Sequence, residues 1–342
     1  MMFTSRRSGK RCGVADAICD AVLFDRDGTL IEDVPYNGDS AAGFRRGCAC
    51  RKPAPGLVTA GTVVGDIGAD GNRRVGCTLV VRSDSAGDVL LAGPAIRAVR
   101  AGSRRRVGRY VPAIFVEHNT PRGDVPETRH PFADRDDLVI VHVTHFNALF
   151  WNTGFTRTAV IEHGIPEPGA RYSGELDRLA VVTNEPLHRW RVTGTDLLIR
   201  FVDVAPIDVY GIGVAGLAAP NVETVEDPPQ WRVHEEIARR RAYLHLCRWT
   251  SLGLSLLEAM TIGVPVIGLA TTEAVTAVPP DAGVLSTDVR ALVDAAHWFI
   301  AEPEAARRIG ARGRQVALAR YGLDRFLADW DRLFEETTCA SR

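Results

Sequence analysis

The sequence predicts an α/β protein built on parallel sheets. Short apolar runs typical of buried strands alternate along the chain with segments of helical periodicity, which is the pattern of βαβ units. Near the C-terminus, a helical segment at 252–262 stops at Gly263 and is followed at once by a continuously apolar run at 264–269. The length of 342 residues corresponds to about two domains.

Three further helices are expected at the C-terminal end, over 288–301, 304–320 and 323–335. The last of them carries one apolar stripe at helical spacing. The residues of that stripe are Leu323, Phe326, Leu327, Trp330, Leu333 and Phe334. Together with the preceding strand, these helices indicate a complete Rossmann-like domain at about 178–340.

Strands are also expected at apolar runs throughout the rest of the chain. A loop is expected at 36–56, a helix at 87–101, and a basic, linker-like stretch at 103–109. The expected strands lie at 21–24, 62–64, 78–81, 114–116, 138–143, 179–182, 202–205 and 242–246.

Composition and charge exclude several classes of protein. The chain is 46% hydrophobic and 24% charged, as in ordinary globular domains. Its 41 basic and 42 acidic residues give a formal charge of -1, which argues against a general nucleic-acid binder. No apolar run approaches the roughly 18 residues of a membrane span. Asp16 and Asp20 interrupt the apolar core of any signal peptide, so we expect a cytoplasmic protein. The odd count of 7 cysteines disfavours a disulfide framework.

Two carboxylates follow the first expected strand. Asp25 and Asp27 lie two residues apart, so both can face one ligand. Asp25 has the chemistry of a nucleophile toward a phosphoryl group, and Asp27 that of an acid and base. Asp66 follows another apolar run and would complete a Mg²⁺ site of oxygen ligands. A solvated acidic turn is the alternative interpretation of the pair.

The strings DRDGTLIEDVPYNGD at 25–39 and VVGDIGAD at 63–70 resemble the haloacid-dehalogenase superfamily. The resemblance is to its D,D-heptose-1,7-bisphosphate and histidinol-phosphate phosphatases. It implies Asp25 as nucleophile, Asp27 as acid and base, and Asp66 as a Mg²⁺ ligand.

The string CACRKPAPGL at 48–57 agrees with the same family, in which Lys52 would partner the phosphate charge. Only 26 residues separate Asp25 from Lys52. In that family, a strand, a helix and a second strand that ends in a phosphate-binding Ser or Thr lie between the two positions. Such a βαβ unit needs about 30 or more residues, so the second strand and its hydroxyl cannot both be present here. Cys48 and Cys50 match half of the family's tetrahedral zinc site. We therefore do not expect zinc unless other cysteines join them.

A short string at 85–95, SAGDVLLAGPA, resembles the start of family-9 glycosyltransferases, the ADP-heptose heptosyltransferases. The resemblance implies that Asp88 acts as a base. An amphipathic helix with an acidic first turn is the alternative interpretation.

The stretch 248–267 combines a loop, a helix, a glycine stop and a buried strand, directly after the expected strand at 242–246. A loop that opens a helix at the carboxyl edge of a parallel sheet is where such folds bind ligands, and its backbone N–H groups suit a diphosphate. Gly253 lets the backbone approach a ligand closely. Glu258 lies in the following helix, where a carboxylate can accept both hydroxyls of a ribose.

The string GLSLLEAMTIGVPVI at 253–267 resembles the donor-site signature of family-4 retaining glycosyltransferases. The resemblance extends from about 110 to 336 and includes VVTNEPLHRWRVTGTDLL at 181–198. It implies a nucleotide-diphospho-sugar donor, with Arg189 and Arg191 as candidates for its diphosphate.

The family's signature has two glutamates, of which Glu258 is the second and Thr250 stands at the position of the first. Thr250 cannot supply a carboxylate to the transferred sugar, so we expect impaired transfer. The resemblance also implies a histidine that lines the cleft near the sugar, for which His118 and His145 are candidates. A structural role for each histidine is the alternative.

The sequence thus favours a glycosyltransferase that uses a nucleotide-diphospho-sugar and a glycan or lipid-linked acceptor. A Mg²⁺-dependent sugar-phosphate phosphatase and an inactive nucleotide-binding relic are the alternatives. We expect a tail at 1–20, a phosphatase-like and heptosyltransferase-like segment at 21–109, a partial glycosyltransferase domain at 110–177, and the GT-B-type donor-binding domain at 178–340.

Overall fold

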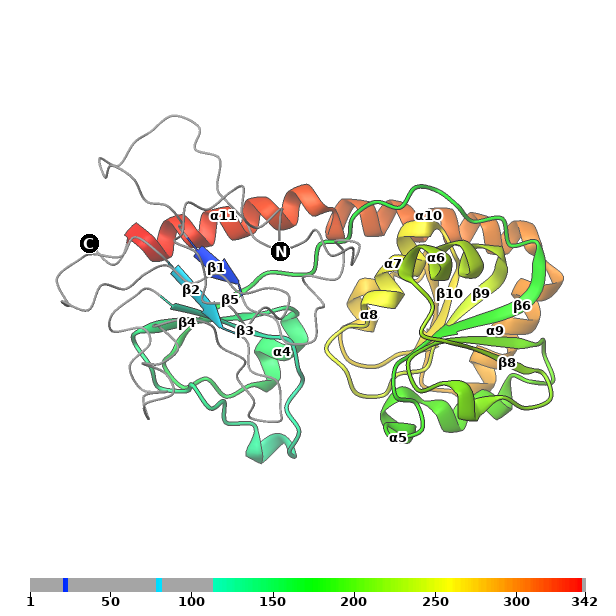
Figure 1. Cartoon of the computed structure of the whole chain (residues 1–342), viewed down its shortest axis with the longest axis horizontal. Helices are drawn as coiled ribbons and strands as arrows, with labels where there is room; N and C mark the ends of the chain where they lie inside the picture. The colour runs from blue at the N-terminus through cyan, green and yellow to red at the C-terminus, as the bar shows by residue number, and fades with distance from the viewer. Residues whose placement is uncertain (1–20, 24–77, 82–112, 340–342) are drawn as a thin grey trace, which may run out of the picture. The chain divides into compact units, whose positions relative to one another are not determined.

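The computed structural model describes residues 21–23, 78–81 and 113–339. The chain forms two compact units (Figure 1). The first unit comprises Met1–Ile161 and Leu327–Arg342, and the second comprises Glu162–Phe326. Residues 162–177 therefore group with the second unit.

The first unit contains a five-stranded sheet in which the strands follow their order in the chain and all run parallel. Phe115, Leu138 and Ile140 form a small apolar core on its third and fourth strands. The sheet consists of β1 (Ala21–Leu23), β2 (Thr78–Val81), β3 (Ala113–Glu117), β4 (Leu138–His142) and β5 (Arg157–Val160). The short helices η1 (Val125–Glu127) and α4 (His145–Phe150) and most of α11 (Leu323–Cys339) complete the unit.

The second unit contains a six-stranded parallel sheet with the strand order β11-β10-β9-β6-β7-β8. Its strands are β6 (Leu176–Val182), β7 (Ile207–Gly211), β8 (Val222–Glu226), β9 (Arg240–His245), β10 (Val266–Leu269) and β11 (Gly283–Ser286). Its helices are α5 (Trp190–Thr193), η2 (Thr195–Arg200), η3 (Ala215–Leu217), α6 (Gln230–Arg239), α7 (Leu254–Ile262), α8 (Ala274–Ala277), α9 (Val289–Ala301) and α10 (Pro303–Tyr321).

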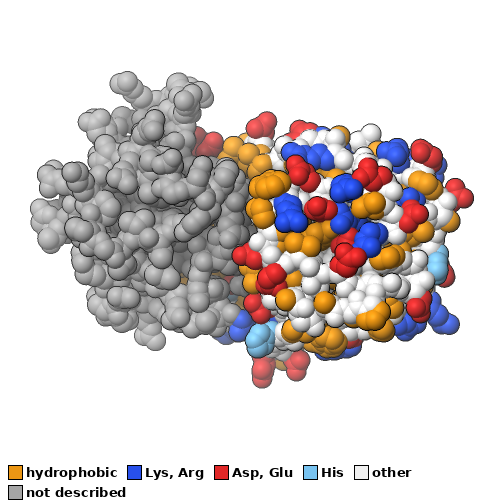
Figure 2. Space-filling view, turned by 45° about the vertical axis from the view of Figure 1, so that its right-hand side comes forward, with side chains coloured by type: hydrophobic (Ala, Val, Ile, Leu, Met, Phe, Trp, Pro, Cys, Tyr) orange, Lys and Arg blue, Asp and Glu red, His pale blue; other side chains and the backbone are white. Residues whose placement is uncertain are grey.

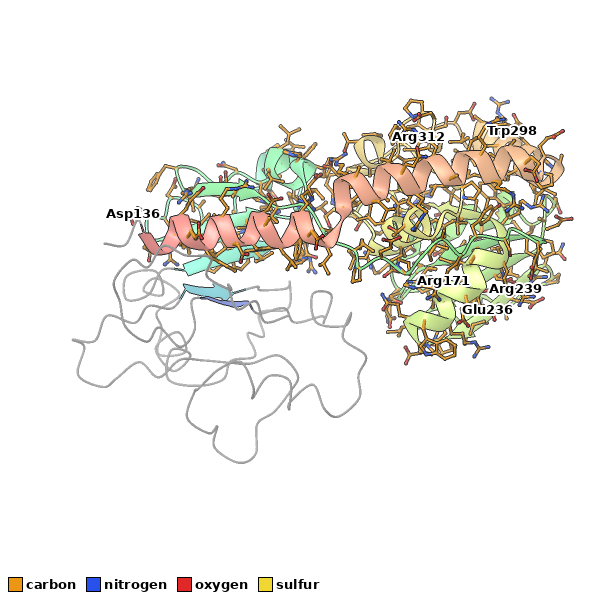
Figure 3. All side chains as sticks on the ribbon, turned by 90° about the horizontal axis from the view of Figure 1, so that it is seen from above. Asp136, Arg171, Glu236, Arg239, Trp298 and Arg312 are labelled. Carbon is orange, nitrogen blue, oxygen red and sulfur yellow. The ribbon has the colours of Figure 1, made fainter. Side chains whose placement is uncertain are left out.

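Helices cover both faces of this sheet. Successive strand residues point to opposite faces, and accordingly Ala180 packs in one apolar cluster while Leu179 and Val181 pack in the other. The first cluster contains residues of α6, α7 and α8, and the second contains residues of η2 and α9. Figure 3 shows the same division, because Glu236 of α6 lies on the side opposite to Trp298 of α9. The α/β fold class predicted from the sequence is thereby confirmed.

The strand order reverses between β6 and β9. From β6 the chain proceeds through β7 to β8 on one side, and then crosses to β9 on the other side of β6. In open parallel sheets, ligands bind outside the carboxyl ends of the strands at such a reversal. A ligand site is therefore expected at the loops that follow β6 and β9.

Most of the expected elements are present, and one is wrong. Residues 202–205 are not a strand but a turn after η2, in which Val204 N–H bonds to the carbonyl of Phe201 at 2.9 Å. The strand of this region is β7 instead. The expected strand at 62–64 and the expected helix at 87–101 lie outside the described residues.

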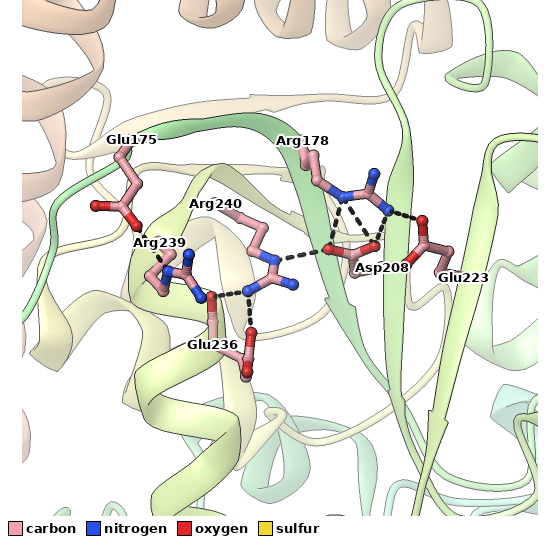
Figure 4. A network of polar contacts seen from close by, with 7 residues as sticks. All are labelled: Glu175, Arg178, Asp208, Glu223, Glu236, Arg239 and Arg240. Atoms are coloured by element: carbon pink, nitrogen blue, oxygen red, sulfur yellow. Dashed lines mark hydrogen bonds and ion pairs between the residues drawn. The ribbon is translucent and has the colours of Figure 1, made fainter.

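An ion-pair network joins the amino ends of β6, β7 and β9, at the sheet edge opposite to the carboxyl ends of the strands (Figure 4). Asp208 accepts hydrogen bonds from Arg178 Nε at 2.9 Å and from Arg240 Nε at 2.6 Å. Its side chain is only 3% exposed. Glu223 pairs with Arg178 at 2.9 Å, and Glu236 pairs with Arg240. Every buried charge here has an opposite partner, as burial requires.

The face of the second unit in Figure 2 mixes acidic and basic side chains, in keeping with a formal charge of -1. Among the described helices, none has the length and apolar character needed to cross a membrane.

Candidate functional site

The helix α7 begins at the carboxyl edge of the second sheet, directly after the loop that follows β9. Its N-cap residue, Gly253, provides no side-chain cap. The first amides of a helix have no intrahelical acceptor, and the helix dipole makes this end positive. Leu256 N–H donates to the carbonyl of Gly253 at 3.1 Å, and the N–H groups before it at the start of α7 suit an anion.

Two residues of β9 support this helix start. A Cβ atom at position 253 would lie 3.0 Å from Cε1 of His245, which is closer than nearly all real contacts, so glycine fits there without displacing the ring. Tyr243 shares a hydrogen bond with Ser255 of the first turn, at 2.9 Å between the two hydroxyl oxygens. The orientation of the helix start is thus fixed by the strand below it.

Burial lowers the pKa of His245 to about 4, so its ring is neutral in the folded protein at neutral pH. An unfolded histidine has a pKa near 6.5. Between these values the unfolded chain binds more protons, so stability falls as the pH is lowered from about 6.5 to about 4. At about 1.4 kcal/mol per pKa unit, the loss from this one residue approaches about 3 kcal/mol.

We therefore expect His245→Gln to flatten the pH dependence of the unfolding free energy between about pH 6.5 and 4. Urea unfolding at several pH values measures it. His297→Gln, at an exposed position on α9, is the matched control and should keep the wild-type slope. An unchanged slope in His245→Gln would show that His245 is not a neutral, buried ring.

Glu258 lies one turn into α7 and contacts two side chains of α6. Its Oε1 accepts a hydrogen bond from Gln230 Nε2 at 2.7 Å, and its Oε2 lies 3.5 Å from Nε2 of His234. The Glu258 side chain is 14% exposed. A small part of the side chain therefore still reaches the surface.

The two predicted arginines differ in their surroundings. Arg191 pairs with Asp196 and is 71% exposed, whereas Arg189 has no ion-pair partner in the part of the chain that the structure describes. Burial raises the pKa of the Cys247 thiol and the nearby Arg189 charge opposes that rise, so Arg189 lies close to the loop after β9. Of the two, Arg189 is the cation available to a ligand.

Asp196 also fixes the loop after β9. It accepts hydrogen bonds from both terminal nitrogens of Arg248, at 2.6 and 2.9 Å, and these bonds lower its pKa. Gly194 packs against the same loop, because a Cβ atom there would lie 1.9 Å from the carbonyl oxygen of Leu246, and its φ of 73° also favours glycine. The loops after β6 and β9 are therefore held together at the reversal point.

Thr250 is half-buried in the loop after β9, beside Trp249, which is 38% exposed. It presents a hydroxyl and no carboxylate. Gly253, Thr250 and Glu258 thus belong to one short stretch, and Arg189 approaches it from the loop after β6.

Sequence reasoning missed Glu226, at the end of β8. Its carboxylate accepts the N–H groups of Gly213, Val214 and Ala215 at 2.6, 2.9 and 3.0 Å, and these bonds lower its pKa. The loop after β7 is thereby held at the same edge of the sheet. In the sequence, Glu226 is one of three acidic residues at 223–227, a pattern that does not distinguish this role from that of a solvated carboxylate.

The two predicted histidines of the first unit are placed differently. His118 is buried directly after β3, whereas His145 is exposed at the start of α4. The sequence did not predict the pair formed by Glu117 and His130, whose Oε2 and Nε2 lie 3.3 Å apart. His130 Nδ1 accepts the N–H of Phe132 at 3.0 Å, so its Nε2 carries the proton toward Glu117.

The phosphatase-like residues Asp25, Asp27, Asp66, Cys48 and Cys50 lie outside the described residues, as do Lys52 and Asp88. Within the described ranges, no group of three or more histidine, cysteine or acidic side chains is arranged to hold a metal ion.

The family described as glycosyl transferases group 1 matches residues 219–316. This region carries α6, α7, Glu258 and Gly253. The match agrees with the resemblance carried by residues 253–267. No curated protein matches the chain.

Solved structures of glycosyltransferases share the fold. A sucrose-phosphate synthase from Thermosynechococcus elongatus has 15% identity and a TM-score of 0.58, over 77% of this chain and 89% of its own. TarM has 14% identity and a TM-score of 0.56, over 76% of this chain. HepE of Anabaena, solved with UDP and glucose, has 12% identity and a TM-score of 0.54, over 78% of this chain and 93% of its own. The match spans 55% of the length of TarM.

Proposed function

We propose that the second unit binds a nucleoside-diphosphate sugar and that the protein transfers the sugar to a hydroxyl of a glycan or lipid-linked acceptor. The observation that carries the proposal is the placement of the α7 start, Arg189 and Glu258 together at the strand-order reversal. The α7 amides and Arg189 would bind the diphosphate, and Glu258 would accept ribose hydroxyls.

We propose a uridine nucleotide as the donor. Solved neighbours in this fold were crystallised with UDP, including S. aureus TarM, the pneumococcal O-GlcNAc transferase GtfA and Anabaena HepE.

The transfer reaction joins the acceptor oxygen to the anomeric carbon and breaks the bond between that carbon and the diphosphate. The nucleoside diphosphate leaves with the electron pair and takes up the acceptor proton. The positive α7 start and Arg189 would stabilise the charge that develops on the leaving diphosphate. The resemblance to family 4 implies retention of configuration.

Thr250 favours a second candidate function, a protein that binds the nucleotide without turning over its sugar. A hydroxyl there cannot offer the carboxylate that the family's signature places eight residues before the helix glutamate. Binding of UDP with no detectable release of sugar from UDP-sugars would support this second candidate.

The two arginines give a matched test of the site. We expect Arg189→Ala to weaken UDP and inorganic pyrophosphate about tenfold, since a hydrogen bond to a charged group contributes about 1.5 kcal/mol or more. Arg191→Ala should leave both affinities within about twofold, because Arg191 is exposed and paired with Asp196. Titration calorimetry measures both ligands.

No binding of UDP by the wild-type protein would refute the donor site. Equal losses in the two variants would instead show that the arginines act only through net charge, and that the diphosphate lies elsewhere.

A further inference from the structure

One face of α6 is directed at the carboxylate of Glu258. Gln230 and His234 are four residues apart, so they lie one above the other on that helix. Their side-chain nitrogens reach the two different oxygens of Glu258, Oε1 from Gln230 and Oε2 from His234. Two helices thus meet at a single acidic group.

The two contacts are unequal. Gln230 Nε2 donates to Oε1 at 2.7 Å, a full hydrogen bond, and a carboxylate can only accept, so the amide must present its NH₂ group. His234 Nε2 lies 3.5 Å from Oε2, which is at the limit of hydrogen-bond distance. Among the described residues, this nitrogen is buried and makes no hydrogen bond. Oε2 therefore keeps its acceptor capacity for an incoming hydroxyl.

A glutamate side chain on a helix surface has several rotamers, and fixing one of them costs conformational entropy. Gln230 reduces the entropy that is lost on binding, because its hydrogen bond already holds one oxygen of the Glu258 carboxylate in the free protein. A ligand that then uses Oε2 finds it already oriented, and such preorganisation strengthens binding without a new contact to the ligand.

We propose that Gln230 is a positioning residue for nucleotide binding, which acts by orienting Glu258 toward the ribose, with His234 flanking the second oxygen. The proposal rests on the proposed function, in which Glu258 accepts a ribose hydroxyl. It requires that Gln230 affect nucleotide affinity only through Glu258. It also requires that this effect depend on the nucleoside part of the ligand alone.

A double-mutant cycle tests this requirement. Titration calorimetry would compare UDP and inorganic pyrophosphate binding to the wild-type protein, Gln230→Ala, Glu258→Ala and the double variant. We expect Gln230→Ala to weaken UDP about three- to tenfold, the range of one net hydrogen bond. The same substitution should have no effect in the Glu258→Ala background, and no variant should change pyrophosphate binding. Glu235→Ala, at an exposed position on the same helix, is the control and should bind UDP as the wild type does.

The outcomes separate this inference from the proposed function. If wild-type protein fails to bind UDP, both are wrong. If Glu258→Ala weakens UDP while Gln230→Ala does not, the donor site stands and the positioning role is refuted. An equal loss from Gln230→Ala in both backgrounds also refutes it, because Gln230 would then act independently of Glu258. Far-ultraviolet circular dichroism and thermal unfolding of each variant establish that the fold is retained.

Discussion

Replacing Asp208 by asparagine is expected to lower the free energy of unfolding by about 3–5 kcal/mol, because it leaves two arginines without their buried counter-charge. The side chains of Arg178 and Arg240 are 22% and 11% exposed, and both donate to the Asp208 carboxylate. An asparagine of the same shape would accept at one oxygen only and would carry no charge. Urea unfolding of the full chain, followed by circular dichroism, measures the loss.

Glu223 provides the matched control for Asp208. It pairs with the same Arg178 at 2.9 Å, but its side chain is 74% exposed. Exposed pairs contribute about 0–1 kcal/mol, so Glu223→Gln should cost less than about 1 kcal/mol. Similar losses in the two variants would mean that burial does not set the strength of the network, and the argument for Asp208 would fail.

The pH dependence of Asp208 has a definite sign. Burial by itself raises the pKa of Asp208, but the hydrogen bonds from Arg178 and Arg240 outweigh it, so the pKa lies below its ordinary value. The stabilisation is therefore present above the unfolded pKa of about 3.9 and is lost as the pH falls below that value. The loss expected from His245 occurs at higher pH, between about 6.5 and 4, which allows the two effects to be separated.

The sequence predicted strands that are almost wholly apolar, such as β4, in which His142 is the single polar residue, and β10. It missed β7, because Asp208 interrupts the apolar run, and only the arginines of neighbouring strands make that charge tolerable inside a sheet. It missed β5 and β8 for another reason. Both are edge strands with exposed polar residues, and they lack the continuous apolar character of buried parallel strands.

The candidate site was predictable only where its residues are close in sequence. Gly253 and Glu258 follow from one strand–loop–helix stretch, since backbone geometry alone places them at the sheet edge. The difference between Arg189 and Arg191 depends on Asp196, and the support of Glu258 depends on α6. These contacts join residues of different secondary-structure elements, so they cannot be predicted from a local sequence pattern.

The largest expected effect on binding comes from Glu258→Ala. If Glu258 accepts a ribose hydroxyl, its loss removes a hydrogen bond to a charged group, which contributes about 1.5–3 kcal/mol. At about 1.4 kcal/mol per tenfold, UDP should bind roughly ten- to hundredfold more weakly. Glu258→Gln keeps the size of the side chain without its charge and should show an intermediate loss, which titration calorimetry with UDP would resolve.

Inorganic pyrophosphate provides the control ligand for Glu258→Ala, since it lacks a ribose and should bind all three proteins alike. Stability provides a second control. The Glu258 carboxylate is 14% exposed and contacts Gln230 and His234, so its removal should lower the unfolding free energy by about 1–3 kcal/mol and leave the protein folded. A loss of affinity with the fold retained would place Glu258 on the ribose. Unchanged UDP affinity in Glu258→Ala would show that Glu258 does not contact the ribose. A loss shared by pyrophosphate would place Glu258 beside the phosphates.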